Sequence, residues 1–194
     1  MCGIFGILPL SGALKPGNDF SEAVASMSHR GPDDYGSWKD DNWPIALGHR
    51  RLSIVDLSPA GHQPMHSPSG RYVIVYNGEI YLHNELRAEL SRCGFSFRGN
   101  SDTEVMLAAI ETWGLEHALE RFVGMFAFAL WDKETCTLHL VRDRLGIKPL
   151  YYLYENGLFA FASEPKAFFA LPDWSPSLDR DAAKGMLRHG YIIG

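Results

Sequence analysis

The 194-residue sequence has little cysteine, no excess of positive charge and no long apolar run, and each lack excludes a class of protein. The three cysteines, at positions 2, 93 and 136, are too few and too irregularly spaced for a disulfide framework. Eighteen basic against 23 acidic side chains give a net charge of -5, which leaves no basic surface for a nucleic-acid backbone. We therefore expect reduced thiols, a cytoplasmic location and no nucleic-acid partner.

Signals for membranes are lacking as well. No apolar stretch approaches the roughly 18 residues that a spanning helix requires. The N-terminus has no basic segment followed by an apolar one, so it does not read as a secretion signal. We expect neither an anchor nor export.

Motifs for metals and nucleotides are also missing. His62 and His66 are four residues apart like a metal pair, but Pro64 opposes the helix that such a pair needs, and no thiolate cluster completes a site. Neither G-x-x-x-x-G-K-[ST] nor G-x-G-x-x-G occurs. We therefore predict no metal and no cofactor in this chain.

What is present is the composition of a folded domain, with 46% apolar and 21% charged residues. Hydrophobic patterns predict strands at residues 2–8, 35–39, 45–52, 71–76, 124–132, 137–142, 150–154 and 158–162. They predict helices at 19–27, 82–93, 102–113 and 179–189. Strands joined by hairpins, with helices grouped between them, indicate an α+β fold of antiparallel sheets buried by helices.

Several local predictions refine this fold. Cys93 lies on the apolar face of its helix and is expected in the core, with Gly94 ending the helix. Residues 101–104 (SDTE) have the form of a capping box, and Gly114 ends the helix that they open. The strand Gly124 to Asp132 is apolar on both faces, so both should be covered.

The first candidate for chemistry is Cys2. Removal of Met1 places a thiol of pKa about 8.5 and an α-amine of pKa about 7.7–8.0 on one residue, so the amine can take the thiol proton directly or through a water. The alternative is that Cys2 is a small apolar residue at the start of a strand. Cys2 alone does not decide between these two interpretations.

Asn77 and Gly78 also have two interpretations. Asn-Gly after a strand is the leading signal for a two-residue hairpin. Alternatively, the Asn77 side-chain amide and the Gly78 N–H form an oxyanion hole, each donor worth up to about 3–4 kcal/mol. The two interpretations are compatible, since a tight turn exposes both donors.

Charged residues near these positions fit an amino-acid substrate. Arg50 and Arg51 face opposite ways in a strand, so at most one of them binds a substrate carboxylate in a given site. Asp102 is suited to an α-ammonium group, or equally to the positive end of a helix dipole. Glu79, beside the Asn-Gly pair, has the same ambiguity.

With these residues collected, the sequence resembles the N-terminal glutaminase domain of asparagine synthetases, which are class II glutamine amidotransferases of the N-terminal nucleophile hydrolase group. The resemblance rests on residues 1–6 (MCGIFG), 29–33 (HRGPD), 49–56 (HRRLSIVD), 76–81 (YNGEIY), 101–104 (SDTE), 124–129 (GMFAFA) and 142–151 (RDRLGIKPLY). These motifs run in the order of the family from residue 1 to about 165.

The resemblance implies a role for each candidate. Cys2 matches the nucleophile and its α-amine the base, while Asn77 and Gly78 match the oxyanion pair. Arg51, not Arg50, matches the arginine that holds the α-carboxylate of L-glutamine, and two acidic residues near the substrate ammonium match Glu79 and Asp102. The family fold has four layers, two antiparallel sheets between layers of helices. Residues 29–33 would lie near the site, and 142–151 would be mainly structural.

The resemblance also implies a second domain. Asparagine synthetases continue into a domain that uses ATP and Mg²⁺ and carries a Ser-Gly-Gly-x-Asp-Ser loop, which is absent here. We therefore expect a glutaminase domain at 1–170 and, at 171–194, a linker and the start of a C-terminal synthetase domain that would be the partner; a homo-oligomer is left open. The expected activity is hydrolysis of L-glutamine, with the ammonia used to make asparagine. The alternatives are another ammonia acceptor, a free-standing glutaminase, or a non-catalytic module.

Overall fold

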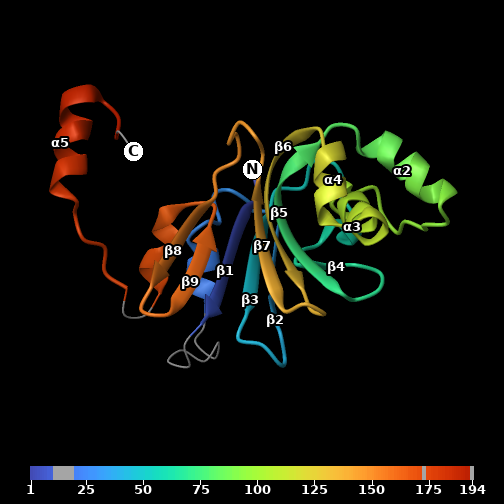
Figure 1. Ribbon diagram of the computed structural model, residues 1–194, viewed down its shortest axis with the longest axis horizontal. Coiled ribbons are helices and arrows are strands. Elements are labelled where there is room, and N and C mark those ends of the chain that lie inside the picture. The colour runs from blue at the N-terminus through green and yellow to red at the C-terminus, as the bar shows by residue number, and fades with distance from the viewer. Residues whose placement is uncertain (11–19, 172–173, 193–194) are drawn as a thin grey trace.

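A computed structural model describes residues 1–10, 20–171 and 174–192. It contains two antiparallel sheets (Figure 1). The first has the order β2-β3-β1-β9-β8, made of β2 (Asp34–Lys39), β3 (Ala46–Arg51), β1 (Gly3–Pro9), β9 (Leu158–Ala162) and β8 (Tyr151–Glu155). The second has the order β4-β5-β6-β7, made of β4 (Met65–His66), β5 (Tyr72–Ile80), β6 (Gly124–Asp132) and β7 (Thr137–Arg142).

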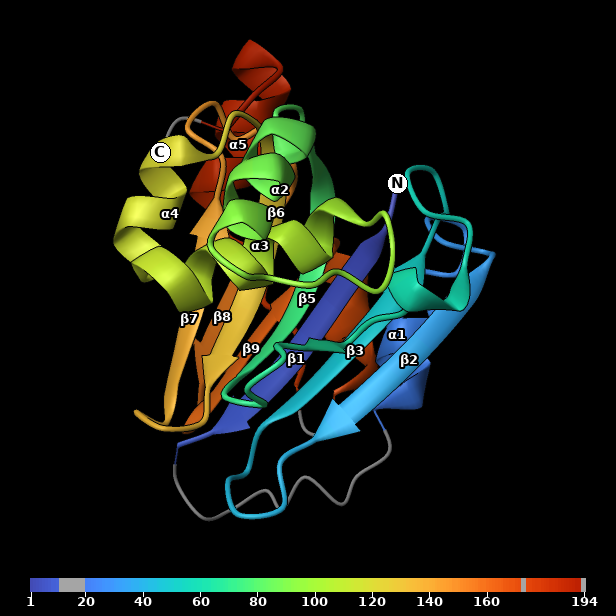
Figure 2. The same ribbon diagram turned by 90° about the vertical axis from the view of Figure 1, so that its right-hand side faces the viewer.

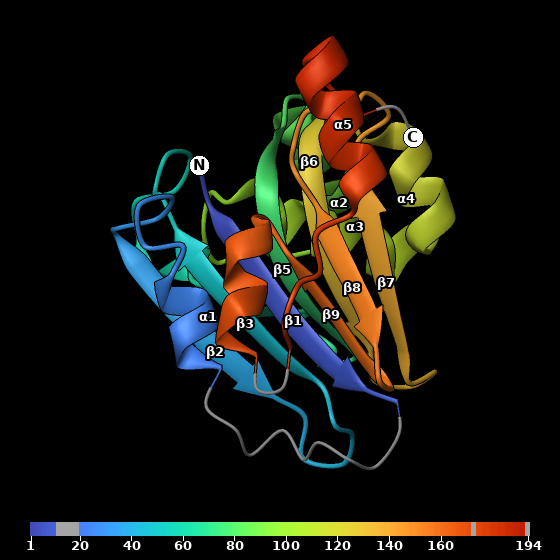
Figure 3. The same cartoon turned by 90° about the vertical axis from the view of Figure 1, so that its left-hand side faces the viewer.

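Helices cover the outer face of each sheet. Helices α2 (His83–Arg92), α3 (Asp102–Trp113) and α4 (Leu115–Arg121) lie on the four-stranded sheet (Figure 2). Helix α1 (Ser21–Ala25) and the 3₁₀ segment η2 (Pro165–Ala170) lie on the five-stranded sheet (Figure 3). A short 3₁₀ turn, η1 (Pro59–Gly61), follows β3. The predicted α+β fold with four layers, two antiparallel sheets between helices, is confirmed.

A core between the two sheets joins them. The inward-facing side chains include Ile4, Leu47, Val75, Ala127 and Trp131, all at most 1% exposed. Strand β6 packs on this core with one face and on the helices with the other, because Phe126 and Phe128 belong to the helix-side cluster. The prediction that β6 is covered on both faces is therefore confirmed.

The last helix, α5 (Arg180–His189), stands apart from the rest of the molecule (Figure 1). It has no buried residue. Its first turn is capped by Asp179, whose Oδ1 accepts the N–H groups of Asp181 and Ala182 at 2.9 and 3.0 Å. The predicted helix at 179–189 is confirmed, and its stability is local because little packing supports it.

The hairpin predicted at Asn77 and Gly78 is wrong. Strand β5 continues through both residues, which pair with Ala127 and Phe126 of β6. Gly78 is required by close approach of the strands, since a Cβ there would lie 2.7 Å from the Cα of Phe126. Asn-Gly in this chain marks tight strand packing, not a turn with positive φ.

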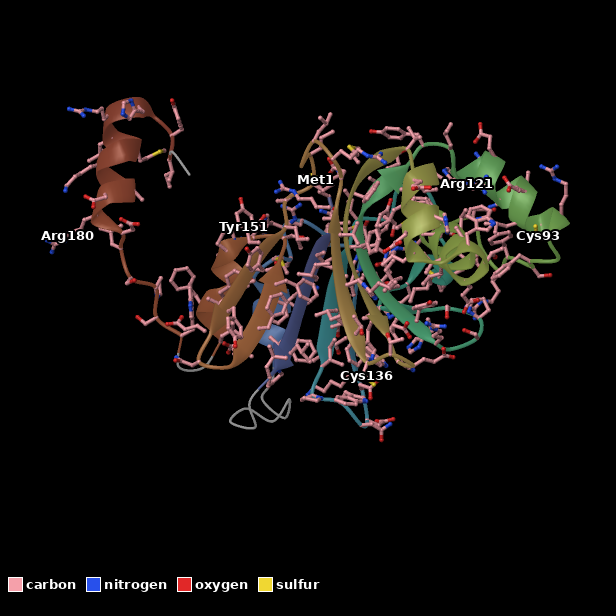
Figure 4. The ribbon with its side chains drawn as sticks, viewed as in Figure 1. Met1, Cys93, Arg121, Cys136, Tyr151 and Arg180 are labelled. Carbon is pink, nitrogen blue, oxygen red and sulfur yellow. The ribbon has the colours of Figure 1, made fainter. Side chains whose placement is uncertain are left out.

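The core position predicted for Cys93 is also wrong. Helix α2 ends at Arg92, and Cys93 is exposed. Gly94 follows with φ 93°, in the left-handed region that ends helices. Figure 4 shows Met1, next to Cys2, far from Cys93 and Cys136, and all three cysteines are free thiols.

Helix starts differ from prediction in two places. Ser101 caps α3 as expected, its Oγ accepting the Thr103 N–H at 3.1 Å. Glu104 does not close the capping box, because its carboxylate accepts the N–H groups of Arg98 and Gly99 at 2.7 and 3.0 Å. The helix predicted at 19–27 is only the short α1, and residue 19 lies outside the described residues.

Helix α4 and strand β4 were not predicted. Among the described residues, no helix is long and apolar enough to cross a membrane.

Candidate active site

Strand pleating turns three chemically distinct side chains toward one another. Side chains two residues apart along a strand share a face. Cys2 therefore shares the inward face of Ile4, Arg51 that of Leu47, and Asn77 that of Val75. Because Gly3 pairs with Arg50, Cys2 lies opposite Arg51 in the same register.

These residues line one cleft at the end of the inter-sheet core. All the predicted site residues contribute to its wall, namely Cys2, Arg51, Asn77, Gly78, Glu79 and Asp102. The accessible volume of the cleft is about 100 Å³.

The Cys2 thiol is held by the backbone of Leu52. Sγ accepts the Leu52 N–H at 3.4 Å and lies 3.7 Å from the Leu52 carbonyl oxygen. Burial raises the pKa of the thiol, against the lowering effects of the Leu52 N–H, the positive N-terminus and Arg51. A nearby base is therefore needed to generate the reactive thiolate.

Arg30 fixes the backbone of the same residue. Its Nε donates to the Cys2 carbonyl oxygen at 2.9 Å, and its Nη1 donates to Glu164 Oε1 at 2.9 Å. Burial raises the pKa of Glu164, but hydrogen bonds from Arg30, His29 and Lys166 outweigh it and lower the pKa to about 2. Glu164 is thus a permanent anion that holds Arg30 against the start of β1. The sequence predicted only that the 29–33 loop lies near the site, and it gave no sign of Glu164.

The edge of β5 next to the cleft is open. Strand β4 pairs with β5 only at Val73 and Ile74. Beyond them the edge N–H groups go to side chains, that of Tyr76 to Gln63 Oε1 at 2.7 Å and that of Ile80 to Asp102 Oδ2 at 3.0 Å. Gly78 lies midway between these two residues, so the alternation of the ladder turns its N–H to the same edge, into the cleft.

Asn77 presents a second donor. Its side chain is 1% exposed, and Nδ2 has no hydrogen-bond partner among the described residues. A buried amide donor without an acceptor is costly unless a ligand satisfies it. Asn77 and Gly78 together therefore offer two N–H donors to an oxygen atom in the cleft.

Arg51 is positioned by the loop that follows β3. Its Nη1 donates to the Ser58 carbonyl at 3.0 Å, and its Nη2 donates to the Asp56 carbonyl. The Asp56 carboxylate accepts the N–H groups of Ser58 and Asn100, both at 2.8 Å, which fixes the loop. A guanidinium has five N–H donors, so three have no partner among the described residues and can bind an anion in the cleft. Arg50 points to the opposite face of the sheet, where it stacks 5.4 Å from the ring of Tyr35.

Asp102 has one oxygen with a structural role and one with no hydrogen bond to the described residues. Its Oδ2 accepts the Tyr76 hydroxyl at 2.7 Å and the Ile80 N–H at 3.0 Å, and neither bond uses Oδ1. Burial, followed by the Asp102 charge, raises the pKa of Tyr76 well above its usual range, which keeps it a donor. Asp102 is also the first residue of α3, so the helix-dipole interpretation and the ligand interpretation hold together.

Three further residues line the cleft: Glu79, which was predicted, and Lys148 and Gln63, which were not. Glu79 lines the wall with no side-chain partner in the described part of the chain. Lys148, only 7% exposed, and Gln63 also line it. The sequence gave no signal for Gln63, and for Lys148 only its place in the 142–151 motif. Elsewhere in that motif Asp143 is structural, because it accepts the N–H groups of Ile147 and Lys148 at 2.9 and 3.0 Å.

The described residues contain no group of His, Cys, Asp and Glu side chains suited to a metal ion. His62 and His66 serve different contacts. His62 Nδ1 lies 2.7 Å from Asp34 Oδ2, and the ring of His66 packs edge-on against Trp38 at 5.9 Å.

Comparison with known proteins identifies the class. Residues 1–193 match the family model of the glutamine amidotransferase domain, and the chain belongs to that family. The resemblance drawn from the sequence motifs is thereby confirmed.

Individual relatives show which members of the family this chain is similar to. Asparagine synthetase [glutamine-hydrolyzing] 3 of Bacillus subtilis is 39% identical over 183 residues, covering 93% of this chain and 29% of that protein. Asparagine synthetase B of Escherichia coli is 44% identical over 169 residues, covering 86% and 30%. Amidase chry2 of Gibberella zeae is 38% identical over 194 residues, covering 93% and 29%. The chain thus spans about 30% of the length of these relatives.

Solved structures agree on the fold. The glutamine phosphoribosylpyrophosphate amidotransferase of B. subtilis superposes with a TM-score of 0.73 at 23% identity, covering 87% of this chain and 43% of that one. This chain is a glutamine amidotransferase domain homologous to the glutaminase domains of asparagine synthetases.

Proposed function

We propose that this domain hydrolyses the side-chain amide of L-glutamine through a γ-glutamyl thioester on Cys2. The observation that carries the proposal is the convergence of a thiol, two free N–H donors, a guanidinium and a carboxylate in one cleft. Each matches one group of the substrate, which has an amide carbonyl, an α-carboxylate and an α-ammonium.

The first half-reaction forms the thioester. After removal of Met1, the α-amine of Cys2 takes the thiol proton, and the thiolate attacks the amide carbon. The oxygen of that carbon becomes an oxyanion that accepts hydrogen bonds from Asn77 Nδ2 and the Gly78 N–H. When the C–N bond breaks, the proton passes from the α-ammonium to the leaving nitrogen, and ammonia departs.

The second half-reaction restores the enzyme. The α-amine takes a proton from water, and the hydroxide attacks the thioester carbon through the same oxyanion hole. The C–S bond breaks, glutamate leaves and the thiol is protonated. Proximity explains why no histidine is needed, because base and nucleophile belong to one residue.

Substrate binding uses the remaining groups. The three free donors of Arg51 bind the α-carboxylate, and a planar fork suits this pairing. Asp102 Oδ1 and Glu79 bind the α-ammonium. The two carboxylates select an amino acid over a simple amide, since an amide without the ammonium leaves them unpaired.

We further propose that the ammonia serves an ATP-dependent synthetase domain that makes asparagine from aspartate. Relatives named asparagine synthetase are about three times as long as this chain, which supports a C-terminal partner domain. ATP and Mg²⁺ would bind only there. The boundary is proposed in the linker that begins at residue 171, because η2 packs on the sheet while α5 has no buried residue; Leu171 and Trp174 of this linker still pack on the core beneath η2. A related amidotransferase with another acceptor is the alternative.

The test is glutamate formation by protein lacking Met1. We expect glutamine to yield equal amounts of glutamate and ammonia, and acid quenching to trap a γ-glutamyl adduct on Cys2 by mass spectrometry. Cys2→Ala should abolish both, with unchanged circular dichroism as the folding control. Equal turnover by wild type and Cys2→Ala, or absence of adduct and turnover in the processed protein joined to its synthetase domain, would favour a non-catalytic module instead.

A further inference from the structure

We propose that His49 is a positioning residue for the oxyanion hole: its imidazole holds the peptide group that leads into Asn77. The proposal rests on the proposed function, because it concerns the same two donors. His49 lies on β3, in the five-stranded sheet, while Tyr76, Asn77 and Gly78 lie on β5, in the four-stranded sheet. His49 thus connects the strand of Arg51 to the strand of the oxyanion donors.

The contact is direct. His49 Nε2 lies 3.0 Å from the carbonyl oxygen of Tyr76, and the His49 side chain is fully buried. That carbonyl belongs to the peptide group between Tyr76 and Asn77, so its orientation sets where the Asn77 side chain begins. A hydrogen bond at this position fixes the direction of the Asn77 amide and, one residue further on, that of the Gly78 N–H.

The same segment lacks the usual means of fixing a strand. At Tyr76 the edge of β5 has no strand neighbour, because β4 pairs only as far as Ile74. Two side chains replace the missing ladder bonds, Gln63 at the N–H of Tyr76 at 2.7 Å and His49 at its carbonyl at 3.0 Å. The edge of β5 must be open for Gly78 to face a substrate. His49 therefore gives the backbone at Tyr76 the rigidity that pairing with a longer β4 would otherwise provide.

His49 lies one step deeper in the inter-sheet core than Cys2 and Arg51. It shares its strand face with Arg51, two residues later, and pairs with Ile4, two residues after Cys2. The neighbouring inward side chains, Ile4, Leu47 and Val75, are apolar.

A polar ring in this layer has a cost. His49 Nδ1 is buried without a partner among the described residues, and an unsatisfied buried polar atom is destabilising. An apolar residue of similar size would fill the space without that cost. A locally unfavourable choice directly beneath a catalytic site is typical of residues retained for function.

The protonation state suits a fixed donor. A carbonyl oxygen only accepts, so Nε2 carries the proton and Nδ1 has the lone pair. Burial lowers the pKa of His49 to about 4, against the raising effects of the Tyr76 carbonyl and Asp34. His49 therefore remains neutral near pH 7 and places no additional positive charge beneath Cys2.

The experiment compares two replacements of His49 with a matched control. In His49→Gln the amide nitrogen reaches approximately where Nε2 lies, whereas in His49→Asn it falls short. Ser67→Ala is the control, because the Ser67 hydroxyl oxygen also bonds the β5 backbone, accepting the Tyr72 N–H at 3.1 Å, but at the far end of the strand. Glutaminase kinetics and the backbone amide exchange rate of Gly78 are measured for each.

We expect His49→Asn to lower kcat at least about 10-fold, a fraction of the loss known for removing an oxyanion donor outright. KM should stay within about 3-fold, because the groups that bind the α-carboxylate and α-ammonium are untouched. Gly78 amide exchange should become faster. His49→Gln should restore kcat and exchange to near wild type, and Ser67→Ala should leave both unchanged.

Three kinetic results would overturn the proposal: wild-type kcat in His49→Asn, equal losses in His49→Gln and His49→Asn, or a comparable loss in Ser67→Ala. The exchange rates keep this test separate from the proposed function. If wild type that lacks Met1 and is joined to its synthetase domain forms no glutamate, the proposed function fails, while unchanged Gly78 exchange in His49→Asn would refute the positioning role by itself. If His49→Asn does not fold, His49→Met, which fills the same space without an N–H donor, takes its place in the comparison with His49→Gln.

Discussion

At the scale of single residues, Arg51 is a test of substrate binding. Arg51→Lys keeps the charge but loses the planar fork, and lysine cannot serve two loop carbonyls and a carboxylate with the same geometry. We expect binding of glutamine to weaken by roughly 1–3 kcal/mol, seen mainly as a higher KM in steady-state glutaminase assays. An unchanged KM would remove Arg51 from the site. Arg50→Lys, on the opposite face of the strand, is the control and should leave KM unaltered.

Asn77 tests the chemical step instead. Its Nδ2 has no partner among the described residues, so Asn77→Ala removes a donor that acts when the oxyanion forms. We expect kcat to fall about 10²-fold or more with a small change in KM. Thermal unfolding should shift little, since no hydrogen bond within the described structure is lost from Nδ2. A variant with normal kcat would refute the assignment.

His49 predicts how stability depends on pH. Above pH 6.5 His49 is neutral in the folded and the unfolded chain. As the pH falls from 6.5 toward about 4, the unfolded chain binds a proton that the buried imidazole does not, so folding stability decreases, by up to about 3 kcal/mol. His49→Gln lacks this titration. Urea unfolding at pH 7, 5.5 and 4.5 should show the stability of wild type falling relative to that of His49→Gln as the pH decreases, and a difference independent of pH would contradict the prediction.

At the scale of elements, short-range sequence patterns predicted most strands and helices. They did not predict which distant parts of the chain pack against them. Strand β9 was predicted at its observed bounds, and Gly94 and Gly114 were predicted as helix ends, because each depends on neighbouring residues. Asn77 and Gly78 were misread as a hairpin because the reason for Gly78 is the proximity of β6, nearly 50 residues later. Cys93 was placed in the core because the pattern did not show that α2 ends one residue earlier.

The candidate site shows the same limit. Cys2, Arg51, Asn77 and Asp102 were recognised through motifs, and the structure brings them to one cleft. Nothing local in the sequence marks Gln63 or Glu164, and His49 is marked only by its place in the 49–56 motif, because their roles depend on contacts between sheets or between distant loops. Residues whose function is to hold another residue are found only when the fold is known.

Replacement of two glycines by alanine should have opposite effects on the stability of the helices that they end or belong to. Gly94 has φ 93° after α2, and Gly185 lies inside α5, with open space around the position of an added Cβ in both cases. Gly94→Ala should destabilise the domain by about 1–2 kcal/mol because alanine is disfavoured at positive φ. Gly185→Ala should raise helicity in α5 by its propensity, about 1 kcal/mol, without changing the main unfolding transition. Circular dichroism and urea unfolding distinguish the two, and equal effects on the main transition would contradict the account.

At the scale of the whole molecule, the sandwich explains why the site lies at its end. The central strands of each sheet bury both faces, one on the other sheet and one on helices, so a cleft that opens into the inter-sheet core lies at strand ends and loops. Cys2 directly precedes β1, Arg51 ends β3 and Gly78 is near the end of β5, at that same end of the core. The fold therefore supplies rigid positions from three strands and leaves the closing surface to loops, as is common for functional sites.

The proposed domain boundary gives the last prediction. Helix α5 has no buried residue, whereas Trp174 packs edge-on against Phe168 and Phe169 at 5.9 and 5.2 Å. A chain ending at residue 178 should unfold within about 0.5 kcal/mol of the full chain, because it loses only exposed contacts. A chain ending at residue 171 also loses the Trp174 contacts and should be less stable by roughly 1–2 kcal/mol. Trp174→Ala in the longer chain is the control for the second effect. Urea unfolding of the three proteins decides the boundary, and a large loss in the chain ending at 178 would show that α5 belongs to the glutaminase fold, not to the next domain.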